Sequence, residues 1–225
     1  MVRDRNASWI VLLVLLGCLI MAWVEAELCP VYPIKSAVKV LTFCGCGTIY
    51  MLRMHDRQLL ACFQKPDALF LRISILLSVG AVVVLLGGYA VLSRWVDFSG
   101  IISNLNEKEG ITAATFPVVA LYISLVNSML EEFFFRGFAF LTLRRYAHPM
   151  FALLFSSICF ALYHVYIMDN WFHPALFVLL TLGLVLSGAL FNLLDWRGSI
   201  WCSWLVHMSA NLGINIIGLH LFGVL

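Results

Sequence analysis

The sequence predicts an all-α protein, a polytopic membrane bundle of about seven transmembrane helices, with six and eight as the bounds. Hydrophobic residues make up 63% of its 225 residues and charged residues only 12%, whereas soluble domains have about 45–50% and about 25%. Several apolar runs reach the roughly 20 residues that a membrane-spanning helix needs. We therefore expect a single integral membrane domain over residues 1–225, with the lipid bilayer as its surroundings.

Seven apolar segments are long enough to cross a bilayer, and an extra half-span near residues 100–116 would alter the count. The first segment follows Arg3 and Arg5 and exceeds the about 7–15 apolar residues of a cleaved signal peptide, so we expect a retained signal-anchor helix. The second is the weakest, because Lys35 and Lys39 lie in its first half. The segments cover residues 8–25, 33–52, 69–93, 115–143, 149–168, 174–194 and 198–223.

The distribution of Lys and Arg predicts the orientation, since these residues favour cytoplasmic loops. With the N-terminus inside, the outer loop near Asp169 holds no Lys or Arg. The inner segments are basic, with Arg3, Arg5, Arg53, Arg57, Lys65, Arg144, Arg145 and Arg197. We therefore expect a multi-pass protein with a cytoplasmic N-terminus and an outer C-terminus. The small size, without a soluble extension, favours a prokaryotic inner membrane.

Charge and cysteine content argue against two other kinds of site. The net charge is +2 and the Lys and Arg residues are scattered, so the sequence predicts no nucleic-acid face. Most of the seven cysteines lie in apolar runs, where Cys usually acts as a small hydrophobe. Cys44 and Cys46 are too close in sequence for a zinc knuckle and lack a second pair.

The fourth span carries the charges that most need an explanation. Glu131, Glu132 and Arg136 lie within an apolar run, and ionisable residues inside a membrane are functional candidates by default. Glu132 and Arg136 are four residues apart, so they share a helix face and can pair. Glu131 is offset from Glu132 by about 100° around the helix. One carboxylate can therefore be held by Arg136 while the other faces a cavity.

Two further spans carry polar side chains at a similar depth. His164 follows Phe160 by one helical turn in the fifth span, and His207 precedes Asn211 by one turn in the seventh. At about 1.5 Å of rise per residue, Glu131 and these polar side chains fall roughly 14–22 Å from the inner ends of their helices. We therefore expect them to meet near mid-membrane from three separate helices.

Each cluster alone has an ordinary structural explanation. Glu132 and Arg136 could form only a structural ion pair, and His164 could be a satisfied core histidine. His207 and Asn211 could be hydrogen-bonding contacts between helices. The joint occurrence is harder to explain, because all these groups are kept from water. Two Glu and two His could also bind a metal ion, but the His-Glu-x-x-His signature is absent, so no metal or other cofactor is expected.

Three ordered motifs resemble those of the CAAX protease and bacteriocin-processing family, glutamate-type intramembrane endopeptidases related to the type II CAAX prenyl endopeptidases. The motifs are Glu-Glu-x-x-x-Arg at 131–136, Phe-x-x-x-His at 160–164 and His-x-x-x-Asn at 207–211. They are complete and in the family's order, while the N-terminal 110 residues carry none. The motif-bearing catalytic core is expected over about residues 115–223.

The resemblance implies a hydrolytic mechanism that needs no metal. Glu131 and His164 would activate a water molecule, because a carboxylate in an apolar cavity can act as a general base. His207 and Asn211 would stabilise the tetrahedral oxyanion, since both side chains can donate hydrogen bonds to it. The implied substrate is a membrane-associated peptide or protein, with or without a lipid anchor, cleaved near its C-terminus.

The same resemblance implies supporting roles for Glu132 and Arg136, which would hold the helix of Glu131 in place. Alternatively, Arg136 would contact the carboxyl end of the substrate.

Two other functions of the protein stay open. One is a catalytically inactive scaffold or bacteriocin-immunity protein on the same fold. The other is a proton-coupled transporter, since Glu and His chains also form proton relays. A transporter should show internal repeats, and the sequence has no convincing one.

A reporter fused after Arg145 tests the predicted topology. We expect it on the cytoplasmic side, because the inner segments carry most of the Lys and Arg residues. A matched fusion after Glu109, in a predicted outer loop, should report the opposite side. Finding the Arg145 fusion outside the cell would show that the predicted orientation is wrong.

Overall fold

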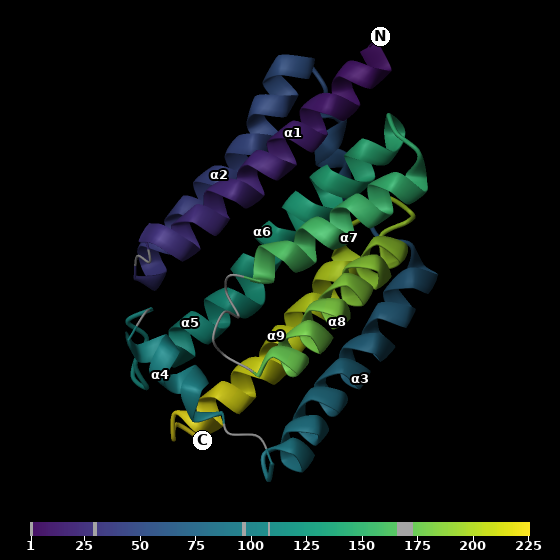
Figure 1. Cartoon of the computed structure of the whole chain (residues 1–225). Helices are drawn as coiled ribbons and strands as arrows, with labels where there is room; N and C mark the ends of the chain where they lie inside the picture. Colours follow the sequence, from purple (N-terminus) through teal and green to yellow (C-terminus); the bar gives the residue numbers. More distant parts are fainter. Residues whose placement is uncertain (1, 29–30, 96–97, 108, 166–172) are drawn as a thin grey trace.

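The computed structural model describes residues 2–28, 31–95, 98–107, 109–165 and 173–225, and within these ranges it contains helices and no strands (Figure 1). A short helical turn, η2 (Arg57–Phe63), follows α2. One long helix over residues 116–145 includes α5 (Phe116–Tyr122) and α6 (Ser128–Glu131). The other helices are α1 (Val2–Trp23), continued by η1 (Val24–Leu28), α2 (Tyr32–Met54), α3 (Ala68–Leu92), α4 (Ser99–Glu107), α7 (Pro149–Val165), α8 (Pro174–Leu194) and α9 (Trp201–Leu221).

The predicted all-α bundle of about seven spans is confirmed. Among the described residues, six helices are long and apolar enough to cross a membrane. The fifth predicted span, 149–168, corresponds to α7, which is apolar but has only 17 described residues; residues 166–168 lie outside the described ranges. The half-span near 100–116 contains α4, whose nine residues are too few to cross.

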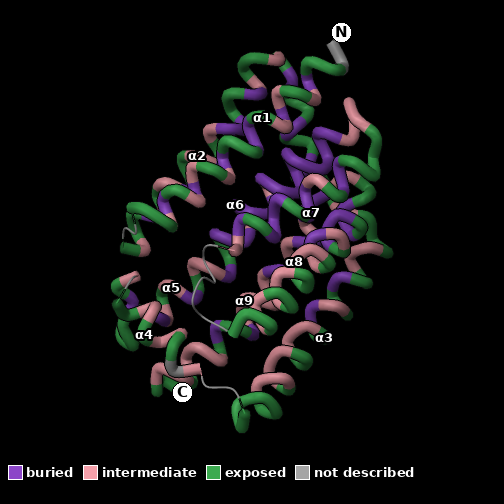
Figure 2. Tube along the Cα trace, viewed as in Figure 1, coloured by how far each residue is buried: buried purple, intermediate pink, exposed green. Residues whose placement is uncertain are grey.

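The long helix over residues 116–145 lies at the centre of the bundle. Half of the residues in its most apolar stretch are buried, whereas only 11% are buried in the corresponding stretch of α3. The pair α1 and α2 packs on one flank, α7 contacts the central helix, and α3 packs on α9 at the other flank (Figure 1). Figure 2 shows buried residues concentrated along α6, whereas few residues of α3 and α8 are buried. In a bilayer these apolar outer helices face lipid.

The loops predicted to be cytoplasmic meet at one end of the bundle. Arg145 and the Tyr146 hydroxyl each donate to Oδ2 of Asp56 at 2.8 Å, and the Ile200 N–H donates to the Cys62 carbonyl at 2.9 Å. Burial alone would raise the pKa of Asp56, but hydrogen bonds from tyrosine hydroxyls and the charge of Arg145 lower it below its usual value. This ionised carboxylate therefore joins loops that are far apart in sequence.

The loops predicted to be outside meet at the opposite end. Lys35 forms ion pairs with Glu25, at 2.6 Å, and with Glu109. At the same end of the bundle, the ring of Phe116, at the start of the central helix, lies 4.8 Å from the ring of Phe222. For the loops within the described ranges, this arrangement agrees with the predicted alternation of inner and outer loops. The loop near Asp169 lies outside those ranges, and the direction in which the bundle faces stays a prediction.

The central helix widens into π-helical turns at Ile123–Asn127 and Glu132–Thr142, on either side of α6. Such turns are frequent at functional sites, and neighbouring helices can satisfy the backbone groups that irregular turns leave free. Three side chains of α9 donate to carbonyls of this helix: Asn215 to Ala120 at 3.0 Å, Asn211 to Ile123 at 3.4 Å and Trp204 to Leu125 at 3.2 Å. These bonds fix α9, and the residues it carries, against α6.

Close packing of α8 on α7 depends on Gly188. A Cβ at this position would lie 3.0 Å from the Cα of Ser157, so the helix backbones would have to separate. We expect Gly188→Val to destabilise the protein by about 1–3 kcal/mol, the usual cost of overpacking. Thermal unfolding in detergent would measure it.

Gly183, on the same helix, is surrounded by open space, because a Cβ added there would have no heavy atom within 4 Å. Gly183→Val is therefore the matched control and should leave the unfolding temperature nearly unchanged. Equal unfolding temperatures for the two variants would contradict the close packing at Gly188.

Candidate active site

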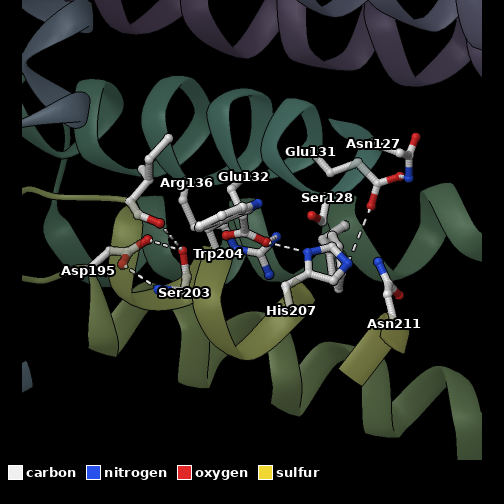
Figure 3. A network of polar contacts seen from close by, with 12 residues as sticks. Asn127, Ser128, Glu131, Glu132, Arg136, Asp195, Ser203, Trp204, His207 and Asn211 are labelled. Atoms are coloured by element: carbon white, nitrogen blue, oxygen red, sulfur yellow. Dashed lines mark hydrogen bonds and ion pairs between the residues drawn. The ribbon is translucent and has the colours of Figure 1, made fainter. Parts of the chain in front are cut away.

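Three helices bring five of the six predicted residues together inside the bundle. Glu131, Glu132 and Arg136 come from the central helix, where their exposed fractions are 2%, 0% and 0%. His164 comes from α7 and His207 from α9. Figure 3 shows the two glutamates facing the helix that carries His207. Groups from three separate helices therefore meet at one polar site, while their depth in the membrane and their catalytic roles stay predictions.

The two carboxylate oxygens of Glu131 have different surroundings. Oε1 accepts a hydrogen bond from the Asn127 amide at 3.0 Å and lies 3.3 Å from Nζ of Lys39. Oε2 lies 3.7 Å from Nε2 of His164 and 3.8 Å from Nε2 of His207. No described residue donates a hydrogen bond to Oε2. One oxygen is therefore anchored, and the other faces the two imidazole rings.

A backbone carbonyl sets the orientation of His164. Its Nδ1 lies 2.7 Å from the carbonyl oxygen of Phe160, one turn earlier on α7. A carbonyl can only accept, so Nδ1 must carry the proton and donate. In the neutral ring Nε2 is then an acceptor, and it is this atom that faces Glu131. Packing of the Phe160 ring against the imidazole, 4.6 Å between centroids, holds the same orientation.

Glu132 links the other two predicted residues. Its Oε1 accepts a hydrogen bond from Nδ1 of His207 at 2.6 Å and lies 3.1 Å from Nη1 of Arg136. The predicted pairing of Glu132 with Arg136 is confirmed. The guanidinium lies over the faces of Phe160 and Phe191, 4.1 and 4.8 Å from their centroids, and none of its donors makes a well-aligned hydrogen bond to a described residue. The side chain of Arg136 is therefore held by its ion pair with Glu132 and by cation–π contacts, rather than by well-aligned hydrogen bonds.

Asn211 stands one turn beyond His207 on α9 (Figure 3). Its amide makes a long hydrogen bond, 3.4 Å, to the Ile123 carbonyl. His207 bonds instead to Glu132, so among the described residues the two predicted oxyanion donors have separate partners. Asn211 is only partly buried, and the hydrogen bond it makes is weak enough to be exchanged for another acceptor.

Two residues at the site were missed from the sequence. Lys39 of α2 is 8% exposed and donates to the Asn127 side chain at 2.8 Å. It also contacts Glu131. Asn127 precedes Glu131 by four residues, so helical spacing could have identified it. The sequence signal for Lys39 is its position inside an apolar span, where an ionisable residue is a functional candidate by default.

No set of three or more His, Cys, Asp or Glu side chains within the described ranges is arranged to hold a metal ion. The metal-free mechanism implied by the resemblance stays a prediction. The chemistry available to the residues present is that of a buried carboxylate with two imidazoles, supported by a second carboxylate and two cations.

Comparison with known proteins finds a match to one family model. Residues 113–213 match the family described as Type II CAAX prenyl endopeptidase Rce1-like. This range contains all six predicted site residues and confirms the resemblance seen in the motifs; Lys39 lies outside it. No curated protein and no solved structure matches the chain. With its apolar helices, the match indicates an integral, multi-pass membrane protein.

Removing Arg136 should strongly destabilise the bundle. Arg136→Met leaves the fully buried Glu132 carboxylate without its cation, and breaking one partner of a buried ion pair typically costs about 3–5 kcal/mol. Thermal unfolding and yield in the membrane would show this loss. The double variant Glu132→Gln with Arg136→Met should recover part of it, because no unpaired charge remains. A single variant as stable as wild type would contradict the structural role of the pair.

Proposed function

From the family match over residues 113–213, we propose that this protein is an intramembrane endopeptidase. It hydrolyses peptide bonds of membrane-associated substrates near their C-terminus. The mechanism is of the glutamate type and uses no metal or other cofactor. Its partners are the lipid bilayer and a peptide or protein substrate, and its N-terminus lies in the cytoplasm.

The observation that carries this proposal is the position of Oε2 of Glu131 between two imidazole nitrogens. The separations of 3.7 and 3.8 Å are too long for direct hydrogen bonds and short enough for one water oxygen to contact the carboxylate and a ring together. With Nδ1 of His164 donating to a carbonyl, its Nε2 can accept a proton from that water. Glu131 and His164 therefore both accept from the attacking molecule.

The reaction then proceeds by general base catalysis. Glu131 takes a proton from the water as its oxygen bonds to the scissile carbonyl carbon, and the carbonyl oxygen becomes an oxyanion. Collapse of this tetrahedral species breaks the C–N bond, and the proton held by Glu131 passes to the leaving amine. Water is consumed, and a carboxylic acid and an amine are formed, between which a proton can pass to give a carboxylate and an ammonium group.

His207 and Asn211 stabilise the oxyanion in this scheme. Because Nδ1 of His207 donates to Glu132, a hydrogen bond from Nε2 to the oxyanion requires the ring to be protonated at both nitrogens. The buried Glu132 carboxylate orients the ring through this bond, as a carboxylate orients the histidine of a hydrolytic triad. Glu132 is thus a partner of the oxyanion site rather than the base.

Glu131→Gln tests the general base. The amide keeps the size of the side chain but cannot take the proton, so turnover should fall by about 10²–10⁴-fold. Purified protein would be assayed with an internally quenched, farnesylated CAAX peptide, and membranes with and without the substitution would be compared by C-terminal proteomics.

Glu27→Gln, at an exposed glutamate of η1, is the control and should cleave like wild type. An unchanged cleavage rate in Glu131→Gln would exclude Glu131 as the base. A wild-type protein without any Glu131-dependent products would favour the inactive scaffold on the same fold.

Asn211→Ala tests the oxyanion site. Loss of one oxyanion donor typically lowers turnover by about 10²–10³-fold, with little change in substrate binding. Asn215→Ala is the matched control, because Asn215 also donates to the central helix, at Ala120 and Ser124, but has no predicted catalytic role. It should lower thermal stability and keep turnover per folded molecule. The same behaviour in Asn211→Ala would reduce Asn211 to a contact between helices.

A further inference from the structure

We propose that Lys39 is a positioning residue that anchors the catalytic carboxylate of Glu131. The inference rests on the proposed function and extends it to α2, a helix outside the matched range 113–213. Lys39 would act through Glu131 and would not itself touch the substrate. The N-terminal pair α1 and α2 would thus supply part of the active site.

Lys39 occupies the side of Glu131 that faces away from the histidines. Its Nζ lies 3.3 Å from Oε1 of Glu131, whereas Nε2 of His164 and of His207 lie nearest to Oε2. The ammonium group also lies 5.2 Å from the centroid of the Tyr163 ring, a favourable distance for a cation and an aromatic face. The carboxylate is therefore held between a fixed cation and the two rings.

Asn127 completes a closed set of polar contacts around Oε1. Its side-chain oxygen accepts from Lys39 at 2.8 Å, and its amide donates to Oε1 of Glu131 at 3.0 Å. All three residues are at most 9% exposed. Because both anchors bind the same oxygen, they restrict rotation of the carboxylate and direct Oε2 toward the imidazoles.

The charge of Lys39 matters as much as its position. An isolated ionised carboxylate in apolar surroundings is very costly and becomes neutral by taking up a proton. A general base must be ionised before the reaction, since it has to accept the proton of water. Arg136 is already paired with Glu132, so Lys39 is the cation closest to Glu131 among the described residues.

The chain offers a matched control in Lys35, one helical turn earlier on α2. Lys35 is equally buried, with an exposed fraction of 7% against 8% for Lys39. It also forms ion pairs, but with Glu25 and Glu109 at the end of the bundle. Replacing either lysine removes one buried cation from the same helix, and only one of them contacts the proposed site.

The first experiment reads Glu131 directly and needs no substrate. Infrared difference spectra would be taken at neutral pH between each purified protein and its Glu131→Gln counterpart. Wild type and Lys35→Met should show the band of an ionised carboxylate for Glu131. Lys39→Met should show the band of a protonated carboxyl group instead. An ionised band in Lys39→Met would overturn the proposal.

The second experiment uses the internally quenched, farnesylated CAAX peptide and counts turnover per folded molecule. Lys39→Met should lower kcat on the order of 10²-fold, the scale expected for a misplaced catalytic group, with KM changed little. Lys39→Arg should restore part of the loss because it restores the charge. Lys35→Met should lower the unfolding temperature and keep kcat. A Lys39→Met protein with wild-type kcat would limit Lys39 to joining α2 to the bundle.

The two proposals fail in different ways. If Glu131→Gln is inactive while Lys39→Met turns over normally, the role of Lys39 is wrong and the endopeptidase stands. If wild type shows no Glu131-dependent cleavage, the endopeptidase and the catalytic role of Lys39 are both wrong. Additive losses in the double variant Lys39→Met with Asn127→Ala would also count against the anchor, because groups that act through one oxygen should not be additive.

Discussion

Two adjacent carboxylates inside the bundle, Glu131 and Glu132, constrain the arrangement around them. Charged groups within a membrane protein are costly unless they are paired. The structure gives each glutamate its own cation, Lys39 at 3.3 Å and Arg136 at 3.1 Å. These cations come from α2 and from the central helix itself. The carboxylates point in different directions because they are successive residues of a helix, so α2, α7 and α9 must all pack around this one point.

The helices that carry the site are joined by polar contacts rather than by apolar packing alone. Lipid tails provide no hydrophobic driving force between helices, so hydrogen bonds and close contact through small residues hold them together. The amides of Asn211 and Asn215 on α9 donate to carbonyls of the central helix. Gly188 lets α8 approach the backbone of α7. The geometry of the proposed site therefore depends on a rigid set of helices around α6.

The two glutamates have different partners, which supports the different roles proposed for them. Glu132 is tied to His207 and Arg136, and this makes it a support for the imidazole. Glu131 keeps one oxygen without a hydrogen-bond donor among the described residues, which suits a base that must receive a proton.

The sequence by itself determined the membrane bundle, its spans and the residues of the three motifs. It also determined the Glu132–Arg136 pair, because helical spacing fixes which residues share a face within one helix. Only the tertiary structure decided the contacts between helices. Lys39 and Glu131 are 92 residues apart, and no spacing rule relates two helices that are not consecutive. The bond from His207 to Glu132, in place of a partner shared with Asn211, likewise depends on how α9 is rotated against the central helix.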